Sequence, residues 1–182
     1  MPYQPSGMWR QVGRNEPKWV DAKDEDRFRR GIYVVWRRAA PYPSFVNFDA
    51  PDRSSCVVGR PRTNTPLQAL TLMNDPAYTE MALALVERVL TERAGASLRD
   101  QISYAYERVL SRTPETAELE HLLYLIESKK EAFAKDPKTA EELVSGNQSV
   151  LKISDTISRE DLAAWFYLGN VLLNLDETVT KG

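Results

Sequence analysis

The sequence predicts an all-α protein, an irregular helical bundle of about six to seven helices with an extended, proline-rich N-terminal arm and a long loop near residues 41–64. Three observations support this prediction. No segment shows a convincing run of the apolar and polar alternation that marks a half-buried strand. Apolar residues instead recur every three or four positions through most of the chain after residue 65, and a Ser, Thr or Asp suited to cap a helix precedes most of these stretches.

We expect residues 1–182 to form a single helical domain, because this length suffices for one hydrophobic core of ordinary size. The composition, 42% hydrophobic and 27% charged, is typical of globular proteins. No apolar run approaches the roughly 20 residues that a membrane-spanning helix needs, and the first residues do not have the pattern of a signal peptide. Within the domain we expect an extended arm (1–23), a helix plus a long loop (24–64) and a helical bundle (65–182).

The arm contains too many prolines and glycines for a regular element, and Trp9 and Trp19 are expected to pin it to the core. Residues 24–40 then predict a helix, since acidic residues at its start and arginines at its end suit the helix dipole. Prolines at 41 and 43 would end it. Its apolar face would consist of Phe28, Ile32, Val35, Trp36 and Ala39.

Residues 41–64 predict a long connection with one helical turn after Asp49. Loops of this length in compact domains are either functional or packed by their own side chains. Phe45, Phe48 and Cys56 indicate that this loop is packed.

Residues 65–93 predict two helices joined by a tight corner. Thr65 and Gln68 fit a capping box with Pro66 at the first helical position, and Asp75 is suited to cap the second helix. The side of the first helix expected to face the core consists of Leu67, Leu70 and Met73.

Capping residues indicate three further helix starts, at Ser97, Thr113 and Ser158. Pro137 is expected to end the second of these helices, residues 138–146 allow a short helix, and residues 147–157 have the composition of a polar loop. The last helix has the most hydrophobic face in the chain and is expected to lie at the centre of the bundle. That face consists of Leu162, Trp165, Phe166, Gly169, Leu172 and Leu173.

Few residue patterns suggest a reaction. Glu118 and His121 have the spacing of a di-iron site, but such sites use the pattern twice and His121 is the only histidine, so we predict no metal site. Cys56 is more simply a buried small residue than a nucleophile. Asp49 and Asp52 could form a general acid–base pair, although capping and turn formation explain them more simply. We therefore predict no catalytic residue and no cofactor in this chain.

Charge is unevenly distributed along the chain. Residues 1–62 contain 12 Lys and Arg against 7 Asp and Glu, whereas residues 63–182 contain 12 against 19, so the two parts are expected to attract each other. Arginines in the first part are interleaved with tryptophans and tyrosines. Internal ion pairs and packing explain this mixture most simply, with contact to a protein or a glycan, and then nucleic acid, as the alternatives.

The loop at residues 60–65 is the best candidate for a binding site. Its polar residues could merely satisfy nearby backbone groups, but two arginines beside a helix N-terminus also suit an anion or a carboxylate. The predicted binding residues are Arg60, Arg62, Thr63, Asn64, Trp36 and Arg37.

Five stretches of sequence carry a family resemblance: residues 24–33, 43–45, 48–53 with Cys56, 62–76 and 171–177. The most specific reads Arg-Thr-Asn-Thr-Pro-Leu-Gln-Ala-Leu, at residues 62–70. In these stretches the chain closely resembles the planctomycete-specific domain of unknown function 1553. The resemblance implies the C-terminal part of a large exported protein, in which this region often follows a companion domain and sometimes a c-type cytochrome module. It supplies no catalytic residue.

Taken with the resemblance, the sequence favours a non-catalytic interaction or scaffold module of an exported multidomain protein, located in the periplasm or cell envelope. Its expected partner is the N-terminal part of the parent protein, or a cell-envelope protein or glycan. One alternative is part of an enzyme site acting on extracellular polysaccharide, with Asp49 or Asp52 as a carboxylate and the tryptophans as a sugar platform. Nucleic-acid binding is a less favoured alternative, because the second part of the chain is acidic.

Overall fold

The computed structural model describes residues 1–7, 19–37, 40–59, 61–147 and 156–180, and these residues contain helices and no strand. The prediction of an all-α fold is therefore confirmed for them. Two short 3-10 helices, η1 and η2, precede the α-helices. The elements in chain order are η1 (Glu25–Phe28), η2 (Gly31–Tyr33), α1 (Pro43–Asn47), α2 (Pro66–Asn74), α3 (Pro76–Glu92), α4 (Leu98–Leu110), α5 (Thr116–Lys135), α6 (Pro137–Gly146), α7 (Arg159–Asn174) and α8 (Asp176–Val179).

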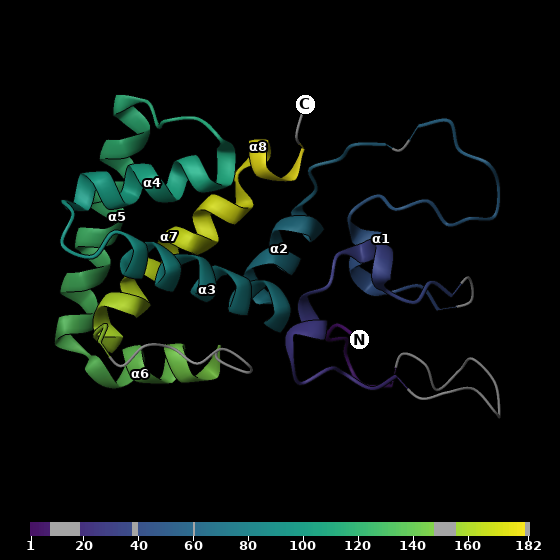
Figure 1. Cartoon of the computed structure of the whole chain (residues 1–182), viewed down its shortest axis with the longest axis horizontal. Helices are drawn as coiled ribbons and strands as arrows, with labels where there is room; N and C mark the ends of the chain where they lie inside the picture. Colours follow the sequence, from purple (N-terminus) through teal and green to yellow (C-terminus); the bar gives the residue numbers. More distant parts are fainter. Residues whose placement is uncertain (8–18, 38–39, 60, 148–155, 181–182) are drawn as a thin grey trace.

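Helix α7 lies at the centre of the bundle, as its apolar face predicts. It packs against α3, α5 and α6, and Figure 1 shows it running between these helices. The side chains of Trp165 and Leu172 are inaccessible to solvent, and Leu173 is packed more shallowly at the edge of the core. None of the described helices is long and apolar enough to cross a membrane.

Gly169 allows α7 to approach α3 closely. A Cβ atom built on this glycine would lie 2.8 Å from the carbonyl oxygen of Ala82 and 3.0 Å from a methyl group of Val86. A side chain at this position would push the two helices apart, which explains why a glycine lies in the middle of the central helix.

The corner between α2 and α3 forms as predicted. Thr65 Oγ1 accepts a hydrogen bond from the backbone N–H of Gln68 at 3.2 Å, and Gln68 Oε1 accepts one from Thr65 N–H at 2.8 Å. Asp75 ends α2 and caps α3, since its N–H donates to the Thr71 carbonyl at 2.9 Å and its carboxylate accepts from Ala77 N–H at 2.9 Å. One residue therefore closes one helix and opens the next.

Two predicted helix boundaries differ from the observed ones. Helix α5 begins at Thr116 with Glu115 as its cap, because Glu118 reaches back to the Glu115 N–H at 2.7 Å and outcompetes the cap expected at Thr113. Pro137 is the first residue of α6, where its missing N–H costs nothing, and Asp136 caps that helix. The predicted polar loop at 147–157 lies largely outside the described residues.

The prediction of one helix over residues 24–40 is wrong. Over residues 24–37, which the structure describes, only η1 and η2 form, and Arg29 between them has an extended backbone, with φ −61° and ψ 143°. Ile32 and Val35 of the predicted face are exposed. The physical reason is tertiary packing. The backbone at Gly31 packs so closely against Phe45 of α1 that a Cβ atom there would lie 2.8 Å from the Phe45 ring, and this contact overrides the local helix propensity.

Aromatic residues form a small second core between this segment, the arm and α1. Trp36 stacks on Phe45 with the ring centroids 4.7 Å apart, and Trp19 stacks on Tyr42 at 5.8 Å. The stacking on Tyr42 pins the arm through Trp19 as expected, and the Trp19 indole also donates to the carbonyl of Pro2, within the arm, at 3.0 Å. The other tryptophan of the prediction, at position 9, lies outside the described residues.

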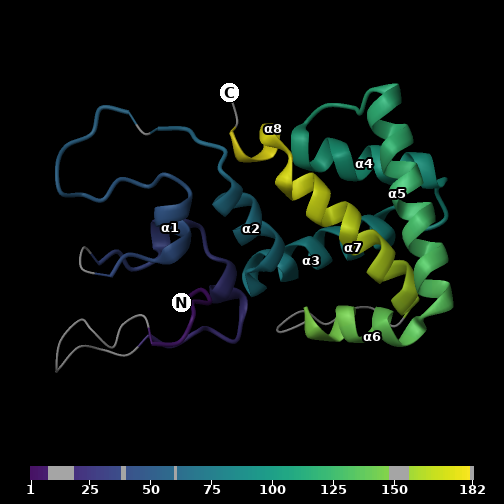
Figure 2. The same cartoon turned by 180° about the vertical axis from the view of Figure 1, so that it is seen from behind.

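The connection at 41–64 contains one helix and one exposed stretch. The helical turn lies before Asp49, as α1, and not after it as predicted. Phe45 and Phe48 pack, but Cys56 is exposed, which contradicts its predicted burial. Figures 1 and 2 show this stretch looping away from the helical bundle. Residues 51–59 thus hold no core position, because the aromatic contacts end at the C-terminus of α1.

Candidate interaction site around helix α2

The candidate site begins with a loop that is tied to the end of α1. The carboxylate of Asp49 accepts two hydrogen bonds from Thr63, one from its N–H at 2.8 Å and one from its hydroxyl at 2.8 Å. Asp49 itself has a left-handed backbone (φ 58°), which an aspartate tolerates better than most residues. These bonds fix residue 63 before α2 begins.

Gln68 connects the same loop to α1 from inside the fold. Its amide nitrogen donates to the carbonyl of Asn47 at 2.8 Å and to the hydroxyl of Thr63 at 3.0 Å, while its oxygen holds the cap at Thr65. Its side chain is almost fully buried. A glutamine therefore occupies a core position because its side chain binds three backbone and side-chain groups there.

The predicted core face of α2 is exposed. Leu67, Leu70 and Met73 are 58%, 53% and 46% accessible to solvent, so the prediction that they face the core is wrong. Gln68 and Leu72 occupy the inner side instead. The apolar spacing shows that these three residues share one side of α2, but it does not show which side packs against the core. The hydrogen bonds of Gln68 fix the rotation of α2 and turn the opposite side inward.

The predicted binding residues separate into two groups. Arg62 and Thr63 line an open hollow of about 430 Å³ together with Phe48 and Thr180. Asn64 donates to the carboxylate of Asp176 in α8 at 2.8 Å. The first residue of the predicted site, Arg60, lies outside the described residues.

Trp36 and Arg37 do not line this hollow. The Trp36 ring stacks on Phe45, and the Arg53 guanidinium lies 4.8 Å from its centroid, so the ring is part of the aromatic core. Arg37, the next residue in the sequence, is half-buried. The structure thus brings Arg62, Thr63 and their neighbours together but leaves this pair elsewhere.

The two carboxylates considered for catalysis are engaged in local structure. Asp49 is bound to Thr63 as described, and Asp52 accepts hydrogen bonds from the N–H of Ser54 at 2.9 Å and from its hydroxyl at 2.8 Å. An acid–base pair needs carboxylates that face a substrate cleft. Asp49 lines the hollow described above, but Thr63 binds both of its oxygens, and Asp52 is not among the residues that line it. The two carboxylates therefore do not face one cleft as a pair.

Titratable groups elsewhere give no metal site. Among the described residues, no group of three or more His, Cys, Asp or Glu side chains could hold a metal ion. His121 is exposed on α5, and the carboxylate of Glu118 is bound to Arg112. The Glu-x-x-His spacing therefore reflects an ion pair on one side and a surface histidine on the other.

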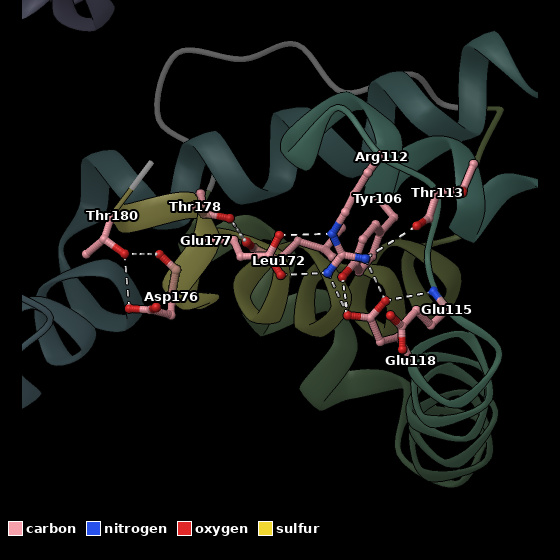
Figure 3. Close-up of polar contacts among 10 residues, drawn as sticks. All are labelled: Tyr106, Arg112, Thr113, Glu115, Glu118, Leu172, Asp176, Glu177, Thr178 and Thr180. Carbon is pink, nitrogen blue, oxygen red and sulfur yellow. Dashed lines mark hydrogen bonds and ion pairs between the residues drawn. The ribbon is translucent and has the colours of Figure 1, made fainter. Parts of the chain in front are cut away.

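Arg112 is the centre of a polar cluster that the sequence did not predict (Figure 3). Its guanidinium donates to Glu177 at 2.6 and 2.9 Å and to Glu118 at 2.8 and 2.9 Å, and it lies 4.9 Å from the centroid of Tyr106. The Tyr106 hydroxyl donates to Glu118 at 2.5 Å. Arg112 thus joins α8 to the corner between α4 and α5. The feature of the sequence that could have pointed to this cluster is Glu118, which completes the capping box of α5 with Glu115.

The cluster shifts the pKa values of its acids. Hydrogen bonds from Arg112 lower the pKa of Glu118 to about 2 and also lower the pKa of Glu177. Burial, followed by the bond to Glu118, raises the pKa of Tyr106. At neutral pH the two glutamates are therefore charged and the tyrosine is neutral, which is the state that the ion pairs require.

The chain matches a known protein family. The model of a family described as "PSD1: Protein of unknown function (DUF1553)" matches residues 1–126, which include the aromatic core, α1 to α4 and the first half of α5. The stretch at 171–177 lies outside the matched range. No curated protein and no solved structure matches the chain significantly. Because the match covers more than half of the sequence, the chain belongs to the DUF1553 (PSD1) family of proteins of unknown function.

Proposed function

We propose that this chain is a non-catalytic interaction module that binds another polypeptide through the outer face of α2. One observation carries the proposal: Leu67, Leu70 and Met73 are about half exposed along one side of a nine-residue helix, while a glutamine is buried on the other side. Isolated exposed apolar residues are common on protein surfaces. Three that follow one another along a single helix face are typical of an interface.

The site is held rigid before any partner binds. The capping box fixes the start of α2, Asp75 fixes its end, and Gln68 fixes its rotation. A preformed face loses little conformational entropy on binding, so more of the contact energy contributes to affinity. This supports a docking role for α2.

A protein partner suits this surface better than a glycan or a nucleic acid. Sugars and bases bind to open aromatic rings, but the rings of Trp19, Trp36 and Tyr42 are stacked within the aromatic core. Tyr33 is exposed, but one ring is a small platform for such a ligand. Leucine and methionine side chains instead complement an apolar protein face. With the family context, we propose the remainder of a larger exported protein, or another cell-envelope protein, as the partner.

Photo-crosslinking tests the proposal. A photoreactive phenylalanine analogue at position 70, in the full-length protein in its native cells, should give one discrete adduct that mass spectrometry identifies. The matched control is the same analogue at Tyr124, an exposed aromatic position on α5 (74% accessible), which should give none. Leu67→Asp should abolish the adduct, and equal yields at positions 70 and 124 would refute the proposal.

The crosslinking variant must remain folded for this test to be valid. Leu67 and Leu70 are exposed, so Leu67→Asp should change the free energy of unfolding by no more than roughly 0.5 kcal/mol. A loss of the adduct without a loss of stability then reports binding alone.

A further inference from the structure

Two arginines from different helices meet on one tyrosine ring at the surface of α3 and α4. The Cζ atom of Arg93, which ends α3, lies 4.3 Å from the ring centroid of Tyr104, and that of Arg108 lies 5.6 Å from it. Both arginines are exposed. The helix dipole favours a cation at a helix C-terminus, but it does not explain why both guanidinium groups lie on the same ring.

Hydrogen bonding through its hydroxyl fixes the position of Tyr104. Its hydroxyl donates to Glu92, which also accepts a hydrogen bond from Arg88 Nε at 2.7 Å. The bond from Tyr104 lowers the pKa of Glu92, with Arg88 and Arg108 contributing, so this carboxylate stays ionised. Glu92 is the acid facing the cluster in these contacts, and it is bound by Tyr104 and Arg88.

Both guanidinium groups keep their hydrogen-bond donors available. A guanidinium that lies on an aromatic ring holds its N–H groups at its own edge, away from the ring face. Within the described part of the chain, neither the Arg93 nor the Arg108 side chain makes a hydrogen bond or an ion pair within 4 Å, although the charge of Arg108 acts on Glu92 from a greater distance. The arrangement therefore presents two oriented sets of donors beside a fixed tyrosine.

We propose that Arg93 and Arg108, held on Tyr104, bind a phosphate group, either as the free ion or as a monoester. The paired N–H groups of one guanidinium are enough to bind a carboxylate. A phosphate has more acceptor oxygens and can accept hydrogen bonds from two guanidinium groups. The site is separate from α2 and does not depend on the proposed docking role.

Titration of the folded chain, followed by the arginine Nε–H signals in ¹H–¹⁵N NMR spectra, tests this site. Inorganic phosphate and glycerol 1-phosphate are added in separate series at constant ionic strength, with chloride as the compensating anion. We expect saturable shifts of the Arg93 and Arg108 signals with half-saturation on the order of 1 mM. Saturation by either phosphate compound supports the site, and the stronger of the two identifies the free or esterified form.

Variants separate a specific site from general attraction of anions. Arg93→Gln or Arg108→Gln should weaken binding at least tenfold, and Tyr104→Leu should do the same by removing the platform. The matched control is Arg99→Gln, an exposed arginine near the start of α4, which should bind as the unaltered chain does. Shifts that do not saturate, or shifts of equal size at Arg99, would overturn the proposal.

Discussion

Asp176 and Glu177 are neighbours in α8, yet their carboxylates bind to two different parts of the molecule. Asp176 accepts a hydrogen bond from Asn64 at 2.8 Å, in the loop before α2, and Glu177 accepts two from Arg112 between α4 and α5. A helix of four residues has little stability of its own. Helix α8 is therefore held by these side chains, and it connects the loop before α2 to the corner between α4 and α5. Figure 3 shows the contact between Glu177 and Arg112.

Removing one of these contacts should loosen α8. Glu177→Gln keeps the size of the side chain but removes the charge that the Arg112 guanidinium binds at 2.6 Å. We expect a lower melting temperature and faster amide hydrogen exchange in residues 176–180, measured by mass spectrometry. Glu142→Gln breaks a more exposed pair with Lys138 at 3.6 Å and should change neither quantity. Equal effects of the two variants would contradict the role given to α8.

The same cluster predicts a loss of stability in acid. Arg112 lowers the pKa of Glu118 in the folded state to about 2, below its ordinary value of 4.5, so the folded chain holds this proton less tightly than the unfolded chain does. Its contribution is therefore fully present above about pH 4.5 and is lost as the pH falls toward 2. Urea unfolding between pH 6 and 2.5 should show a decline that is shallower in Glu118→Gln. An unchanged decline in that variant would assign the acid sensitivity to other carboxylates.

The sequence predicted those parts of the fold that depend on local rules. Caps at Thr65, Asp75, Ser97 and Ser158 formed as expected, because each needs only a side chain and a nearby N–H group. The central position of α7 followed from the size of its apolar face. The predictions failed where contacts between residues distant in the sequence decide the backbone conformation. In the segment predicted as a helix over 24–40, for example, Gly31 packs against Phe45 of α1.

The sequence pointed to the loop of the candidate site but did not predict the contacts that its residues make. The loop before α2 was identified, but its Thr63 and Asn64 proved to bind Asp49 and Asp176, which are 14 and 112 residues away in the sequence. No local pattern reports such pairings. The exposed face of α2 was likewise missed, because apolar spacing marks a face without saying whether it turns inward.

The orientation of α2 can be tested with two adjacent residues. Gln68→Ala should lower the free energy of unfolding by roughly 1–3 kcal/mol, since it removes a buried side chain that donates to the part-buried carbonyl of Asn47. Leu67→Ala removes a larger apolar side chain but should cost less than about 0.5 kcal/mol, because Leu67 is exposed. Chemical unfolding of both variants gives the comparison. The reverse order would mean that Leu67 is the buried residue.

The close approach of α7 to α3 makes a second prediction about packing. Gly169→Ala places a methyl group 2.8 Å from the Ala82 carbonyl oxygen and should destabilise the fold by roughly 1–3 kcal/mol. Gly146→Ala is the matched control, because a Cβ there meets nothing within 4 Å. That change should be neutral or stabilising by up to about 1 kcal/mol. If both variants unfold at the same denaturant concentration, the two helices do not pack through Gly169.

The ion pair between Arg27 and Glu80 offers a test of how the basic and acidic parts of the chain are joined. Arg27 comes from the basic first part and Glu80 from α3, their side chains are 9% and 0% exposed, and Arg27 Nε lies 3.4 Å from Glu80 Oε2. Two buried charges stabilise a fold only while both are present. Glu80→Ala should therefore cost roughly 3–5 kcal/mol, because it leaves the arginine charge buried without this carboxylate.

Replacing both charges should be far less harmful than replacing one. Arg27→Met with Glu80→Met fills the same space with apolar groups, and buried pairs exchanged in this way are often neutral in stability. Chemical unfolding of the two single variants and the double variant gives the coupling energy directly. A double variant as unstable as the sum of the two single variants would show that the two charges act independently of each other.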